Sequence, residues 1–144
     1  MKRFNIRVYG LLVDNGRVLV SDEIIRGQRI TKFPGGGLEL GEGTKDCLMR
    51  ELREEMGIEA NDLRHFHTTD HFQQSAYNES DQLISIYYRY SVPNVEALPY
   101  GTSSFGDPAS GAEWFRWLDL GMANVDTMSL PVDRVVLALL MSFS

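Results

Sequence analysis

The stretch FPGGGLELGEGTKDCLMRELREEMGI, which covers Phe33–Ile58, decides the fold of this chain. Three consecutive glycines lie near its start, and three carboxylates are crowded into five residues near its end, on Glu51, Glu54 and Glu55. Like charges at helical spacings of three and four repel, at a cost of about 0.2–0.5 kcal/mol per pair. The crowding of negative charge therefore needs a chemical explanation.

The segment from Thr44 to Met56 has the periodicity of a helix. Leu48, Leu52 and Met56 recur every four residues and predict one buried stripe along it. Gly57 follows directly and suits the left-handed conformation in which many helices end. The pattern therefore predicts a helix over residues 44–56.

With about 100° per residue, the three carboxylates share an arc of about 100° beside the buried stripe. Arg50 and Arg53 fall on the side farthest from it, so the sequence offers no cation to balance the acids. Hard divalent ions such as Mg²⁺ and Mn²⁺ prefer carboxylate oxygens, and they polarise phosphoryl oxygens or generate hydroxide. The arc predicts a divalent metal site, although an acidic run of this kind also occurs on ordinary exposed helices.

The remaining segments predict strands around this helix and a second helix near the end of the chain. The expected strands are 4–13, 17–21, 63–68, 83–92 and 113–118, and the expected helix is 132–141. Asp14-Asn15-Gly16 is typical of a hairpin turn between the first two strands. The mixture predicts a single α/β domain over residues 1–144, with a mixed sheet between helices.

Composition limits the partners of the protein. The 144 residues have a formal net charge of -6, which argues against binding polymeric nucleic acid through a basic surface. Cys47 is the only cysteine, so a disulfide framework and a tetrathiolate zinc site are excluded. The sequence shows neither a signal-like start nor an apolar run of about 18 residues. We therefore expect a cytoplasmic protein that does not enter membranes.

The longer pattern around the acids is more specific than the acids themselves. The fixed positions are Gly36, Glu42, Arg50-Glu51-Leu52, Glu54-Glu55 and Gly57-Ile58. This spacing resembles the Nudix box at every signature position from Gly36 to Ile58, and Phe33-Pro34-Gly35 resembles the usual lead into it. The rest of the chain resembles Nudix domains more loosely. The resemblance implies a Nudix-like α/β/α sandwich with a mixed β-sheet. It also implies Mg²⁺- or Mn²⁺-dependent hydrolysis of a nucleoside diphosphate linked to another moiety.

Site roles follow from the resemblance, position by position. Glu54 and Glu55 are expected to be the principal metal ligands. Glu51 is expected to be a further ligand or the base that activates water, and the carbonyl of Gly35 can reach a metal. The residues expected to support the box are Gly36, Glu42, Arg50 and Gly57.

Many Nudix proteins take one more ligand or base from outside the box. Here the first candidates are Glu113 and Asp107, and the second candidates are Glu79 and Asp81. For each of them, the alternative interpretation is an acidic side chain in a solvated loop. His65 and His67 are expected to share one face of a strand, but they lack a third zinc ligand at motif spacing. We interpret Cys47 as a small filler in the helix.

The substrate is not specified by the sequence. The proline typical of hydrolases specific for ADP-ribose, the tyrosine typical of those for dinucleoside polyphosphates, and the coenzyme A signature are all missing at their usual places. A nucleoside triphosphate or another small nucleotide conjugate remains open.

A non-catalytic Nudix-like sensor is the alternative function, although such modules usually lose box glutamates. An isopentenyl diphosphate isomerase would need a catalytic cysteine elsewhere. The resemblance also implies that a homodimer can form.

Overall fold

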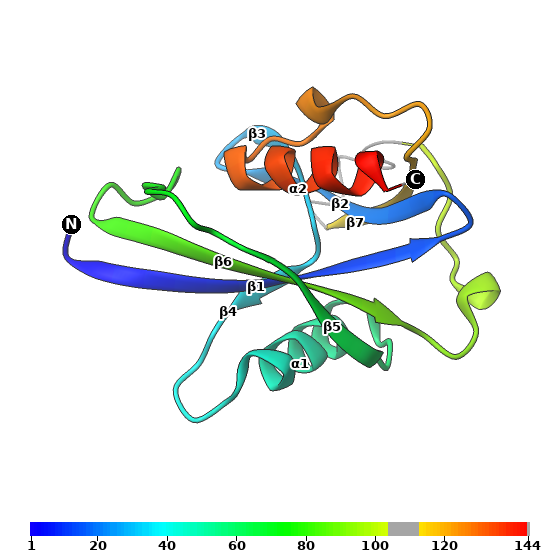
Figure 1. Cartoon of the computed structure of the whole chain (residues 1–144), viewed down its shortest axis with the longest axis horizontal. Helices are drawn as coiled ribbons and strands as arrows, with labels where there is room; N and C mark the ends of the chain where they lie inside the picture. The colour runs from blue at the N-terminus through cyan, green and yellow to red at the C-terminus, as the bar shows by residue number, and fades with distance from the viewer. Residues whose placement is uncertain (104–112, 144) are drawn as a thin grey trace. The chain divides into compact units, whose positions relative to one another are not determined.

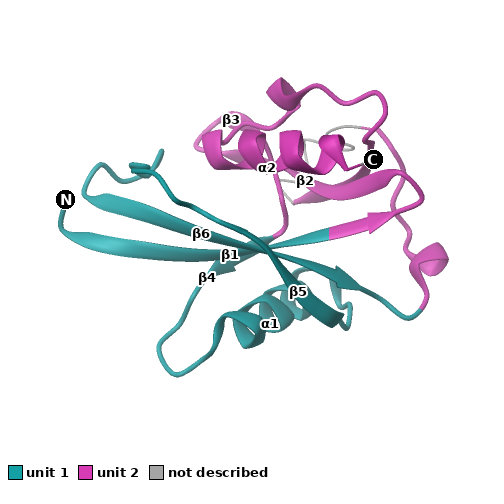
Figure 2. Cartoon of the chain, in the orientation of Figure 1, with its two compact units in different colours: residues 1–11, 35–93 teal, residues 12–34, 94–144 magenta. Residues whose placement is uncertain are grey.

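The computed structural model describes residues 1–103 and 113–143, and these divide into two compact units (Figure 2). Unit 1 consists of residues 1–11 and 35–93, and unit 2 of residues 12–34 and 94–144. Strand β1, Arg3–Asp14, contributes to both units. In the described part of the chain, no helix is long and apolar enough to cross a membrane.

Unit 1 is built from three strands around β1. The three-residue strand β4, Gly35–Gly37, pairs antiparallel with β1 and places Gly36 opposite Val8. Strand β6, Asp81–Ser91, also neighbours β1, and β5, Asn61–Thr68, pairs antiparallel with β6. The arrows of β1 and β6 run in the same direction (Figure 1). The strands are thus mixed in direction, and the predicted fold class is confirmed.

The helix of unit 1, α1, spans Thr44–Met56, the bounds predicted from the periodicity. At its start, the Asp46 carboxylate accepts a hydrogen bond from the backbone N–H of Gly43 at 3.1 Å. At its end, Gly57 adopts a left-handed conformation with φ 67°. Leu48 and Leu52 are fully buried, and Leu48 lies against β1 beside Gly10. This packing fixes the acidic arc of α1 relative to the strands.

Unit 2 is organised around β2, Arg17–Ile25. This strand pairs antiparallel with the end of β1, with β3, Gln28–Lys32, and with β7, Trp114–Asp119. Helix α2, Pro131–Ser142, begins with proline at its first turn, where the missing N–H costs nothing. Two short 3₁₀ turns complete the unit, η1 at Val95–Ala97 and η3 at Val125–Thr127.

The structure has two strands that the sequence analysis did not predict. Strand β2 continues beyond Ser21 and turns back into β3 through Arg26 and Gly27, whose φ angles are 51° and 77°. Arg-Gly is a weaker turn signal than Asn-Gly, so the hairpin was missed. Strand β4 was interpreted only as a glycine run, because glycine is depleted in strands.

One prediction about β5 was wrong. His65 pairs with Tyr88 and His67 pairs with Tyr87, and the register shifts between the two histidines. Tyr87 and Tyr88 are consecutive and point to opposite faces, so the two histidines do as well. A β-bulge therefore separates side chains that strict alternation would place on one face.

Candidate functional site

Strand β4 brings the backbone of the glycine run against α1. A Cβ atom on Gly36 would overlap the carboxylate of Glu51. A Cβ atom on Gly35 would overlap the backbone of β1 at Val8 and Tyr9. Gly35 therefore requires glycine, because backbone atoms of β1 lie too close for any side chain, whereas a side chain at position 36 would force the Glu51 carboxylate to move.

Arg50 on α1 is the centre of the hydrogen bonds around this strand. Its Nε and Nη2 donate to the two carboxylate oxygens of Glu42 at 3.0 and 2.7 Å, a bidentate pair. Nη2 also donates to the carbonyl oxygen of Gly37 at 3.2 Å. Arg50 thus joins α1, the loop before it and β4. The supporting role expected for Arg50 and Glu42 stays a prediction.

The same guanidinium reaches the acidic arc. Nη1 donates to Glu51 at 2.9 Å and to Glu54 at 3.3 Å, and it lies 3.8 Å from a carboxylate oxygen of Glu39. The expectation that no cation balances the acids was wrong. The wheel placed Arg50 away from the buried stripe, but its long side chain folds back along the helix and is only 23% exposed. One positive charge is shared by Glu39, Glu42, Glu51 and Glu54, which leaves an excess of negative charge.

The surroundings of Arg50 contain two groups whose pKa values are shifted in opposite directions. Hydrogen bonds from Arg50 and from the backbone of Glu39 lower the pKa of Glu42 to about 2. Burial and the neighbouring Glu42 raise the pKa of Cys47 to about 12. The Cys47 thiol is fully buried and donates to the carbonyl oxygen of Gly37 at 3.5 Å. Such a thiol is unreactive, in agreement with its interpretation as a filler.

The donor set fits a hard divalent cation. The carboxylates of Glu51 and Glu54 converge on one nitrogen of Arg50, so a positive charge already lies between them. Glu55 follows on the same helix and is half-buried. As the side chains stand, no three His, Cys, Asp or Glu groups among the described residues are close enough to hold a metal. A bound ion would therefore replace Arg50 as the partner of at least one of these carboxylates.

The candidates outside the box have different surroundings. Glu113 lies just before β7, where its carboxylate accepts hydrogen bonds from the hydroxyl of Ser21 and, at 3.2 Å, from the ammonium of Lys32. Asp81 is 2% exposed and paired with Arg3 at 2.8 Å, which gives it a structural partner.

The two remaining candidates outside the box are Glu79 and Asp107. Glu79 is exposed in the loop before β6, where its backbone carbonyl accepts from Gln74. Asp107 lies outside the described residues.

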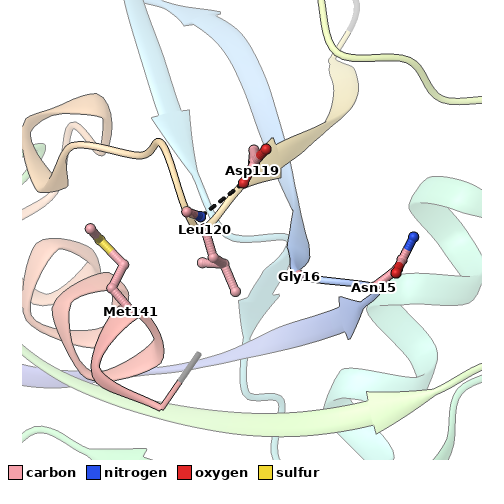
Figure 3. Close-up of a pocket in the computed structure, with 6 residues that line it drawn as sticks. Asn15, Gly16, Asp119, Leu120 and Met141 are labelled. Atoms are coloured by element: carbon pink, nitrogen blue, oxygen red, sulfur yellow. Dashed lines mark hydrogen bonds between the residues drawn. The ribbon is translucent and has the colours of Figure 1, made fainter.

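A surface hollow in unit 2 contains none of the predicted site residues (Figure 3). Its volume is about 540 Å³, and its lining is formed by Asn15, Gly16, Asp119, Leu120, Gly121 and Met141. The Asp119 carboxylate accepts from the backbone N–H of Gly121 at 2.8 Å. This acid stabilises the turn after β7, so the hollow shows no chemistry comparable with that of α1.

Comparisons with known proteins agree with this geometry. The model of the NUDIX domain matches residues 1–140. The 8-oxo-dGTP diphosphatase of Escherichia coli K12 is 28% identical over 140 residues, covering 96% of each chain. The RNA pyrophosphohydrolase of Acinetobacter baylyi is 47% identical over 45 residues, which is 31% of this chain and 26% of that protein.

A solved structure shows the same fold. The MutT NUDIX hydrolase from Burkholderia pseudomallei superimposes with a TM-score of 0.67 at 16% identity, covering 94% of this chain and 96% of its own. The similarity confirms the Nudix-like fold class predicted from the sequence. Together with the match of the domain model over 140 residues, it leads to one conclusion: this chain belongs to the Nudix family and is an enzyme of the Nudix hydrolase class.

Proposed function

We propose that this enzyme hydrolyses a phosphoanhydride bond of a nucleoside diphosphate linked to another moiety, and that the reaction depends on Mg²⁺ or Mn²⁺. The observation that carries the proposal is the excess of carboxylates around Arg50. Four acids share one guanidinium beside a glycine strand against which Glu51 is packed. A divalent cation is the partner that such an oxygen-rich, negatively charged cluster favours.

In the proposed mechanism, Glu51, Glu54 and Glu55 hold the metal, with the carbonyl of Gly35 as a further ligand. The bound metal would polarise a phosphoryl oxygen and lower the pKa of a coordinated water. Glu51 holds the metal or accepts the proton of the attacking water. Arg50 holds the loop that carries Glu42 against α1 and contacts Glu51 and Glu54, so it keeps these carboxylates in place for the substrate. Glu113 or Asp107 is proposed as an additional ligand or base.

Among substrates, we propose a nucleoside triphosphate. The relative that matches almost the whole chain is named an 8-oxo-dGTP diphosphatase, and no signature of another subclass is present in the sequence. The net charge of -6 favours a small substrate over polymeric nucleic acid. We further propose that residues 1–144 act as one domain in the cytoplasm, as a monomer or a homodimer.

A substrate panel followed by ³¹P NMR tests the proposal. The panel contains dGTP, 8-oxo-dGTP, ADP-ribose, a dinucleoside tetraphosphate and a nucleotide sugar, each with Mg²⁺, with Mn²⁺ or with EDTA. We expect metal-dependent turnover of a triphosphate, and the phosphorus products identify the bond that breaks. Turnover that persists in EDTA would contradict the metal dependence. Binding of a nucleotide without any turnover would favour the sensor.

A further inference from the structure

Arg7 is a second arginine beside the glycine strand, and the sequence analysis gave it no role. It lies on β1 directly opposite Gly37 of β4. Its Nη1 is 3.4 Å from the position that a Cβ atom on Gly37 would occupy. The guanidinium therefore lies in space that this glycine leaves open, on the face of β4 opposite to the one that Glu51 contacts at Gly36, because neighbouring residues of a strand point to opposite faces.

The Arg7 side chain is held in place by an aromatic neighbour. Its Nε donates to the hydroxyl of Tyr9 at 3.2 Å, and its guanidinium carbon lies 5.9 Å from the centre of the Tyr9 ring. Tyr9 is 5% exposed and lies against Tyr87, with ring centres 5.2 Å apart. A half-buried arginine anchored in this way loses less conformational entropy when it binds a ligand than one free in solvent.

The charge of Arg7 acts near the proposed metal ligands. Burial lowers the pKa of Arg7, but attraction to Tyr9, Glu51 and Cys47 raises it by more. Among the described residues, however, no carboxylate lies within ion-pair distance of Arg7. Arg7 is thus attracted electrostatically to Glu51 but does not form an ion pair with it.

Arg7 and Arg50 differ in how many of their side-chain N–H groups already make hydrogen bonds within the protein. A guanidinium carries five N–H groups. Arg50 makes five hydrogen bonds to oxygen atoms, of Glu42, Glu51, Glu54 and Gly37. Arg7 makes one such bond to the described residues, through Nε, so the four N–H groups on its two terminal nitrogens face no protein acceptor there. Paired terminal nitrogens of this kind match two oxygens of one phosphate.

We propose that Arg7 binds a phosphate group of the nucleotide substrate at strand β4. This inference rests on the proposed function, because it assumes a nucleotide whose phosphates lie at the acidic arc of α1. A chain with a net charge of -6 needs a local positive charge to hold a polyanion there. In this structure all five N–H groups of Arg50 bind oxygen atoms, whereas the two terminal nitrogens of Arg7, across β4 from Glu51, face no acceptor among the described residues.

The test is calorimetric binding of dGTP and of inorganic tripolyphosphate in EDTA, where turnover is prevented. We expect Arg7→Gln to weaken binding of both ligands by about 10- to 100-fold, the range for hydrogen bonds to a charged group. The matched control is Arg89→Gln, an exposed arginine on β6, which should bind both ligands like the wild type. Arg7→Lys keeps the charge but loses the fork, so its affinity should fall between the two.

Unchanged binding of tripolyphosphate by a folded Arg7→Gln protein would overturn the inference. Thermal unfolding verifies folding, and Arg7→Lys serves in its place if the glutamine variant does not fold. Other outcomes distinguish failure of the proposed hydrolase function from failure of the phosphate contact. An Arg7-dependent affinity without hydrolysis in Mg²⁺ would retain the phosphate contact and reject the hydrolase. Hydrolysis with unchanged kinetics in Arg7→Gln would retain the hydrolase and reject the phosphate contact.

Discussion

Two arginine–carboxylate networks, one in each unit, differ in charge balance and exposure. In unit 2, Arg116 donates to Asp22 at 2.7 Å, and the hydroxyl of Thr31 donates to the same carboxylate at 2.6 Å. Asp22 is 1% exposed and Arg116 8%. In unit 1, Arg50 shares its single charge with four carboxylates, and the Glu54 side chain is 60% exposed.

The difference separates a structural ion pair from a site. The unit 2 pair is neutral and closed, so nothing further can bind to it without breaking it. The unit 1 network keeps excess negative charge at the surface, which a cation from solution can neutralise. Burial with charge balance thus indicates stability, and exposure with charge excess indicates ligand binding.

The largest expected effect is on the buried pair. Arg116→Ala leaves the Asp22 carboxylate buried without its cation, and we expect the free energy of unfolding to fall by about 3–5 kcal/mol. Urea denaturation measures this loss. The double variant Asp22→Leu, Arg116→Met removes both charges and should recover most of the stability. A single variant as stable as the wild type would show that the pair is not a structural element.

The next effect concerns the acidic arc. Glu54→Gln and Glu55→Gln each remove one negative charge, and we expect turnover to fall by about 10²-fold or more, or about 2.7 kcal/mol in the activation barrier. The stability of the Glu54→Gln protein should hardly change, because the Glu54 side chain is mostly exposed. Steady-state kinetics and thermal unfolding of the same preparations separate the two quantities.

Glu59→Gln is the matched control for these variants. Glu59 is also an exposed acid, lies shortly after the end of α1 and pairs with Arg53 at 2.8 Å. Its loss should leave turnover near the wild-type level. Equal activity of the Glu54 and Glu59 variants would remove the distinction between the acidic arc and an ordinary charged surface.

The smallest effect is the pH dependence of the Glu42–Arg50 pair. The pKa of Glu42 is lowered to about 2 from an ordinary value of 4.5, so the pair contributes stability above pH 4.5 that is lost as the pH falls toward 2. Glu42→Gln should therefore be less stable than the wild type at pH 7. Urea denaturation at several pH values should show this difference shrinking below pH 4.5. A difference that stays constant down to pH 3 would contradict the depressed pKa.

Local periodicity made the helix around the acids predictable. Leu48 and Leu52 are fully buried and Gly57 ends the helix as expected, because these signals depend on neighbours along one helix. Met56, at the end of the predicted buried stripe, is only half-buried. The family pattern also gave the fold class. These predictions needed no knowledge of which strands meet in space.

Features that depend on tertiary contacts could not be predicted in this way. The partners of Arg50 depend on how a long side chain folds back over the helix, which a helical wheel does not represent. The role of Gly36 depends on the contact of β4 with Glu51, far along the chain. The β-bulge that separates His65 from His67 has no turn residue to signal it.

The central claim, that the acidic arc of α1 is a divalent cation site, is tested most directly by Mn²⁺ binding. Electron paramagnetic resonance measures free Mn²⁺ in titrations of the wild type, Glu54→Gln and Glu59→Gln. We predict that Glu54→Gln binds Mn²⁺ at least about tenfold more weakly than the other two proteins, because a ligand is lost. Equal Mn²⁺ affinity in all three proteins would contradict the claim.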